Sequence, residues 1–136
     1  MPEVPLLQKV DAVTVPVPDL DTGLRFYRDS LGHELRRRND QVGQAGLAPP
    51  GSETEIVLTT RQAYEPNWLV TSTDQAAAAI AAAGGRVLTE PFDIPVGHLT
   101  VVADPFGNAL VLLDLSKGHY VTNDTGNVTG VNPSKG

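Results

Sequence analysis

The chain contains no cysteine among its 136 residues. Disulfide bonds, thiolate metal sites and a cysteine nucleophile are therefore excluded, although this absence does not fix the cellular compartment. Aromatic residues are scarce, at 5%, whereas hydrophobic residues make up 40% of the sequence. This hydrophobic content is sufficient for a packed core, so we expect one folded domain and neither a second domain nor global disorder.

Positive charge is also limited. The sequence has 10 Lys and Arg against 16 Asp and Glu, which gives a formal net charge of −6. Nucleic acids and anionic membrane surfaces are both bound by basic surfaces, so neither is an expected partner. The one basic run, Arg36 to Arg38, is followed at once by Asn39 and Asp40. It is interpreted as a solvated strand end in preference to an anion-binding site.

Long hydrophobic runs and several common sequence signatures are missing. No apolar stretch approaches the ~20 residues that span a bilayer. The N-terminal sequence MPEVPLLQKV lacks the basic and apolar regions of a signal peptide, so a cytoplasmic location is expected. There is no GxSxG nucleophile elbow. Gly84-Gly85 ends a predicted helix instead of opening one, and is therefore not a phosphate-binding loop.

The first half of the chain shows a β-α-β-β-β pattern. Apolar and polar residues alternate before Asp19, which is a favourable helix N-cap, and Gly32 ends the helix that follows. The predicted elements are a strand over 10–17, a helix over 19–32, and strands at 33–38, within 40–52 and at 55–60.

The same order of elements recurs in the second half. The elements are a strand over 67–72, an alanine-rich helix over 74–83, and strands at 86–89, 98–103 and 108–115. The halves share this order but little identity, which predicts two βαβββ modules at about 7–61 and 62–117. Residues 118–136 are polar and are expected either to form a small hairpin around residues 124–126 or to fray.

Three segments together resemble the vicinal oxygen chelate superfamily, which includes glyoxalases, extradiol dioxygenases and bleomycin-resistance proteins. They are DAVTVPVPDLDTGLRFYRDSLG at 11–32, TDQAAAAIAAAGGRV at 73–87 and VVADPFGNALVLLDL at 101–115. The resemblance implies an α+β fold of paired βαβββ modules that form a curved mixed sheet around a cavity. It implies one such domain over residues 1–117, commonly assembled as a homodimer.

The resemblance also implies four inward metal ligands, mostly His and Glu, one on each of four strands. The corresponding positions are, in chain order, Ala12, Val57 or Glu55, Glu65 or Asn67, and Val111. Alanine and valine side chains have no donor atom, so only Glu55 and Glu65 are weak metal candidates. No metal or other cofactor is expected.

Strand alternation predicts a cavity wall that is largely apolar with a few polar anchors, as in a small-molecule pocket. The predicted ligand-binding residues are Ala12, Thr14, Val57, Thr59, Asn67, Leu69, His98, Thr100, Val111 and Leu113. His98 faces the cavity if Leu99 and Val101 pack under a helix. It would then be a general base or, in the favoured interpretation, a polar wall residue. Trp68 is expected with Val70 on the side packed against the helix.

No catalytic residue is predicted. By resemblance to the metal-free bleomycin-resistance branch, the leading interpretation is a metal-independent protein that sequesters a small molecule, such as an antibiotic or a similar hydrophobic or aromatic ligand. The alternative is a metal-dependent lyase, isomerase or dioxygenase of the same superfamily. A third possibility is a domain that only mediates assembly, with its cavity collapsed.

Overall fold

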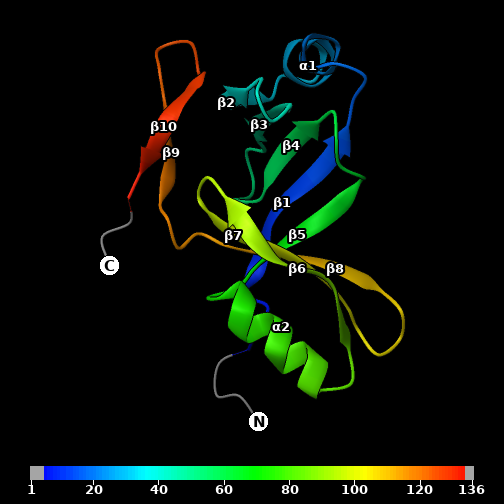
Figure 1. Ribbon diagram of the computed structural model, residues 1–136. Coiled ribbons are helices and arrows are strands. Elements are labelled where there is room, and N and C mark those ends of the chain that lie inside the picture. The colour runs from blue at the N-terminus through cyan, green and yellow to red at the C-terminus, as the bar shows by residue number, and fades with distance from the viewer. Residues whose placement is uncertain (1–4, 134–136) are drawn as a thin grey trace. The chain divides into compact units, whose positions relative to one another are not determined.

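The computed structural model describes residues 5–133, and these residues form two compact units. The first unit comprises 11–66 with 121–130, and the second comprises 67–120 with 5–10 and 131–133. The outermost residues of the predicted domain and tail, 1–4 and 134–136, lie outside the described residues. Both units contain a sheet and helical structure, as Figure 1 shows for each unit taken separately.

The first unit follows the β-α-β-β-β order. Its elements are β1 (Lys9–Pro16), α1 (Leu20–Leu24), the π-helical segment η1 (Arg25–Ser30), β2 (Glu34–Asn39), β3 (Gln44–Ala48) and β4 (Glu55–Thr59). The strand order is β2-β3-β4-β1, with β1 parallel to β4 and the other pairs antiparallel. Asp19 caps α1 by accepting a hydrogen bond from the backbone N–H of Thr22 at 2.7 Å. The single predicted helix is therefore α1 continued by a wider π-helical turn.

The core of the first unit lies between α1 and one face of its sheet. Its buried members are Leu20, Leu24, Ala45, Leu47 and Leu58. Because side chains alternate along a strand, Gly46 and Val57 belong to the opposite face, away from α1. Gly23 allows the close approach of α1, because a Cβ there would lie 2.9 Å from Cγ1 of Val17.

The second unit repeats the order. Its elements are β5 (Glu65–Leu69), α2 (Thr73–Ala82), β6 (Arg86–Ile94), β7 (Gly97–Ala103) and β8 (Ala109–Asp114). The strand order is β5-β8-β7-β6, with β5 parallel to β8. The predicted α+β class with two βαβββ modules is confirmed.

The core of the second unit lies beneath α2. Its buried members are Val70, Ala76, Ala77, Val102 and Leu112, and Trp68 packs against them, so the predicted side for Trp68 and Val70 is confirmed. Helix α2 ends at Ala82, and Gly84 follows with a φ of +104°, a conformation that glycine adopts without strain.

The C-terminal segment forms a hairpin instead of fraying. Strand β9 (His119–Thr122) pairs with β10 (Val128–Asn132). The Asn123 side chain accepts hydrogen bonds from the backbone N–H groups of Thr125 and Asn127, both at 3.0 Å. Gly126 in this turn accepts a 2.7 Å hydrogen bond from the backbone N–H of Arg38 on β2. Side-chain hydrogen bonds within the turn thus stabilise it, and the backbone hydrogen bond from Arg38 holds it at β2, an edge strand of the first unit's sheet.

No helix in the described part of the chain has the length and apolar character needed to cross a bilayer.

Candidate functional site

The first two predicted metal positions lie on neighbouring strands of the first unit. In the parallel register of β1 and β4, Ala12 is opposite Glu55 and Thr14 is opposite Val57. Glu55 forms an ion pair with Arg37, and the two side chains are only 16% and 20% exposed respectively. The weak metal candidate Glu55 is therefore engaged by a guanidinium group, and its neighbour Ala12 supplies no donor atom.

The last predicted metal position lies in an apolar part of the second unit. Val111 is opposite Asn67 on β5 and opposite Val101 on β7. Leu113, two residues further along β8, is likewise opposite Leu69. Across residues 5–133, no group of three or more His, Asp and Glu side chains is placed to hold a metal ion. These side chains do not fit the His- and Glu-rich metal site that the resemblance implies.

Two threonines of the predicted wall are hydrogen-bonded to the backbone. Thr14 donates its hydroxyl to the carbonyl oxygens of Ala63 at 2.7 Å and Glu65 at 3.1 Å. The Thr59 hydroxyl accepts from the backbone N–H of Arg61 at 3.1 Å, and Thr59 is fully buried. These hydroxyls hold the segment after β4 against the sheet.

The predicted orientation of His98 and Thr100 is wrong. In the register of β7 with β8, His98 is opposite Asp114 and Thr100 is opposite Leu112. Leu112 and Val102 belong to the core beneath α2. Since paired residues share a face, His98 and Thr100 lie on the α2 side of the sheet. Alternation had indicated correctly that His98, Thr100 and Val102 share a face, but the helix covers that face and not the face of Val101.

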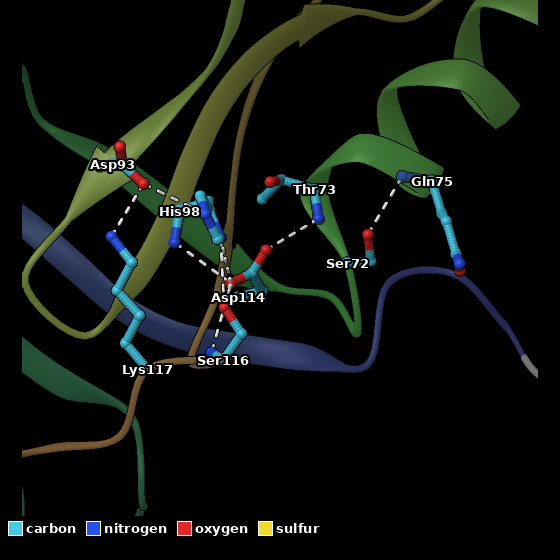
Figure 2. Close-up of polar contacts among 8 residues, drawn as sticks. All are labelled: Ser72, Thr73, Gln75, Asp93, His98, Asp114, Ser116 and Lys117. Atoms are coloured by element: carbon cyan, nitrogen blue, oxygen red, sulfur yellow. Dashed lines mark hydrogen bonds and ion pairs between the residues drawn. The ribbon is translucent and has the colours of Figure 1, made fainter. Parts of the chain in front are cut away.

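His98 belongs instead to a polar cluster around Asp114, which Figure 2 shows at the start of α2. Asp114 is 2% exposed. Its carboxylate accepts hydrogen bonds from the backbone N–H of Thr73 at 2.9 Å, the backbone N–H of His98 at 3.1 Å and the Ser116 hydroxyl at 2.7 Å. One charge thus joins the first turn of α2, the start of β7 and the turn after β8. This cluster leaves no local signal in the sequence, because Thr73 and Asp114 are far apart in the chain.

The hydrogen bonds determine the charge of Asp114. Burial is the largest single influence and raises its pKa. Hydrogen bonds from Ser116, Thr73 and His98 together outweigh burial and lower the pKa to about 2. The carboxylate is therefore ionised at neutral pH, where it also interacts favourably with the positive end of the α2 dipole.

The geometry of the cluster is not that of a catalytic triad. Both Ser116 Oγ and Asp114 Oδ1 lie 3.2 Å from the same imidazole nitrogen, Nδ1 of His98. The opposite nitrogen, Nε2, lies 3.3 Å from Asp93 Oδ1. In a triad the hydroxyl and the carboxylate contact opposite ring nitrogens, and here Ser116 donates its proton to Asp114. The arrangement stabilises structure and activates no nucleophile.

Asp93 forms the exposed end of the cluster. Lys117 donates a hydrogen bond from Nζ to Asp93 Oδ1 at 2.8 Å and thereby lowers the Asp93 pKa. The side chain of Asp93 is 79% exposed, so this ion pair is a weak surface interaction.

Comparisons with known proteins agree with this fold. Methylmalonyl-CoA epimerase from Mycobacterium tuberculosis is 23% identical with a TM-score of 0.64, over 84% of this chain and 92% of that chain. The hypothetical protein BH1468 from Bacillus halodurans C-125 is 16% identical with a TM-score of 0.63, over 85% of this chain and 98% of that chain. The Mn(II)-bound glyoxalase from Novosphingobium aromaticivorans is 19% identical with a TM-score of 0.55, over 95% of this chain and 42% of that chain.

At these identities the solved structures establish the fold alone, and no curated protein sequence matches the chain. The sequence profile of the Glyoxalase/Bleomycin resistance protein/Dioxygenase superfamily matches residues 9–112, which is most of the chain. The chain belongs to the Glyoxalase/Bleomycin resistance protein/Dioxygenase superfamily.

Proposed function

We propose that this chain binds a small organic molecule without a metal ion and does not transform it. The observation that carries the proposal is that Ala12 and Val111 are apolar where the resemblance implies the first and last metal ligands. Neither side chain has a lone pair to offer a cation. Each is opposite a residue that does not restore a metal site, since Glu55 is ion-paired and Asn67 is a single neutral amide.

The sheet faces away from the two helices suit an apolar ligand. In the first unit this face carries Ala12 and Val57, and in the second unit it carries Leu69, Val111 and Leu113. Contact with such side chains stabilises a bound organic molecule by about 25 cal/mol for each Å² of apolar surface removed from water. Sequestration of an antibiotic or a similar hydrophobic or aromatic compound would require only this contact and a polar anchor.

The alternative is a metal-dependent lyase, isomerase or dioxygenase. The similarity to proteins named as a methylmalonyl-CoA epimerase and a Mn(II)-bound glyoxalase favours this alternative. A metal-dependent enzyme would need donor atoms at positions where this chain has alanine and valine, and for that reason we favour binding without metal.

Metal analysis and thermal unfolding test the proposal directly. We expect less than one equivalent of Zn, Ni, Mn or Fe per chain in the purified protein. We also expect no rise in the melting temperature when these ions are added. A ligand that binds only the folded state at about 100 times its Kd adds about 2.7 kcal/mol of stability, which for this chain length would raise the melting temperature by roughly 9 °C.

A native mass spectrum should show an organic compound retained by the protein, and chromatography should recover that compound unchanged. A stoichiometric metal together with a thermal shift abolished by a chelator would contradict the proposal. So would recovery of a product formed with turnover.

A further inference from the structure

The ion pair between Arg37 and Glu55 joins strands that are not neighbours. Arg37 is on β2 and Glu55 is on β4, with β3 between them. Adjacent strands are about 4.8 Å apart, so the Arg37 side chain must cross β3 to reach its partner. It crosses at Gly46, where a Cβ would lie 2.8 Å from Nη1 of Arg37 and 3.2 Å from Oε1 of Glu55. Glycine at this position therefore provides the space for the pair.

A β-bulge decides which face of the sheet carries the guanidinium. Leu35 is opposite Leu47 and packs on the α1 core, and a regular strand would place Arg37 on that same face. The register shifts between Leu35 and Arg37, so Arg37 is opposite Gly46 and lies on the face away from α1. Arg38, one residue later, returns to the α1 side, where it pairs with Asp21.

The ion pair stands beside the first metal position of the superfamily. Glu55 is the register partner of Ala12, the residue that the resemblance assigns to the first metal position, so the charged pair is adjacent to that position. A half-buried ion pair usually stabilises a fold no better than an apolar pair of similar size, because both charges lose hydration. The location of the Arg37–Glu55 ion pair therefore favours a role in recognition of the small-molecule ligand.

We propose that Arg37 is the anchor for a carboxylate group on the small-molecule ligand, and that Glu55 positions it. This inference rests on the proposed function and names the ligand class for the same surface. A guanidinium stays charged at all physiological pH values and offers a planar fork of N–H donors that matches the two oxygens of a carboxylate. The ligand carboxylate binds beside Glu55 or displaces it. The ligand is then an organic acid with an apolar body.

Titration with benzoate, followed through the Nε–Hε resonance of Arg37 at constant ionic strength, tests this proposal. We expect saturable shifts with benzoate and none with benzamide, its uncharged isostere. Arg37→Met should weaken benzoate binding by about tenfold or more, as the loss of a charge-assisted hydrogen bond predicts. Arg38→Met is the matched control, because Arg38 lies on the same strand but faces α1, and it should leave binding unchanged.

A second variant distinguishes loss of benzoate binding from loss of folding. Arg37→Met leaves the half-buried Glu55 without this guanidinium, so the double variant Arg37→Met with Glu55→Gln is measured as well and should also lose benzoate. Equal binding of benzoate and benzamide, retained binding in the double variant, or no binding to the wild type would overturn the inference.

Failure of this inference can be distinguished from failure of the proposed function. If a neutral aromatic compound binds the metal-free chain equally well with and without Arg37, the proposed function stands and the role of Arg37 is refuted. If binding of any compound requires an added metal ion, the proposed function itself fails.

Discussion

Asp114 carries a buried negative charge whose partners come from three parts of the second unit. Its hydrogen bonds to Thr73, His98 and Ser116 replace the water that the carboxylate loses on folding. Gly97 is required beside it, because a Cβ there would lie 2.7 Å from Oδ1 of Asp114 and 2.0 Å from its backbone oxygen. The charge of this residue therefore supports the local fold, which predicts a pH-dependent stability.

We expect Asp114 to make folding sensitive to acid. Its pKa is lowered from 3.8 to about 2 in the folded chain. Its contribution is therefore complete above the unfolded pKa and is lost as the pH falls from about 4 through about 2. Linkage places this contribution on the order of 2 kcal/mol at neutral pH.

Chemical denaturation between pH 7 and pH 2 measures this effect. Asp114→Asn should be less stable than the wild type at pH 7, and the difference should shrink below pH 4. Asp124→Asn, an exposed change in the hairpin turn, is the control and should leave the pH profile unaltered. An Asp114→Asn variant as stable as the wild type at pH 7 would contradict this role.

Among the elements, the C-terminal hairpin has a role that its composition did not predict. Strand β2 is an edge strand of its sheet. The carbonyl oxygen of Gly126 in the hairpin turn accepts a hydrogen bond from the backbone N–H of Arg38 on that strand. Asn127 also forms an isolated bridge with Arg38. Edge strands expose unpaired backbone groups that promote aggregation. Covering the edge with another segment of the chain is one of the ways in which proteins protect it. The turn is well suited to this because Asn123 holds its shape.

We predict that Asn123→Ala releases the hairpin from β2. The change removes the hydrogen bonds that the Asn123 side chain accepts from Thr125 and Asn127. Hydrogen exchange of the Arg38 amide should then accelerate by about tenfold or more, because its acceptor in the turn is no longer fixed.

The amide of Val17 is the internal reference for this experiment. It donates to Thr59 at 2.9 Å within the same unit and away from the hairpin, so its exchange should not change. Equal acceleration of both amides would indicate general destabilisation, and unchanged exchange at Arg38 would show that the turn does not protect the strand.

At the scale of the whole molecule, we predict a homodimer. The resemblance implies such an assembly, and closed two-fold symmetry is the commonest arrangement among oligomers. Light scattering should give twice the 14.4 kDa mass of one chain at micromolar concentration. A monomer under these conditions would contradict the prediction, and the variants Arg37→Met and Asn123→Ala should leave the mass unchanged.

The sequence alone predicted the order of strands and helices in both modules, including the helix stop at Gly84 and the side of Trp68 that packs against α2. The assignment of Ala12 and Val111 to the first and last metal positions rests on the resemblance and stays a prediction. These features depend on local periodicity, on capping residues and on counting along the chain, all of which are written in the order of the residues.

Only the tertiary structure decided which face of β7 is covered by α2 and which residues form long-range pairs. Alternation groups His98 with Val102 but does not say which group α2 covers. A single bulge at Arg36 reverses the side of Arg37 and brings it to Glu55, and the contact between Thr73 and Asp114 joins residues 41 positions apart. These contacts form only when the sheet and the helix pack together. They therefore depend on residues from several segments and cannot be inferred from any one segment alone.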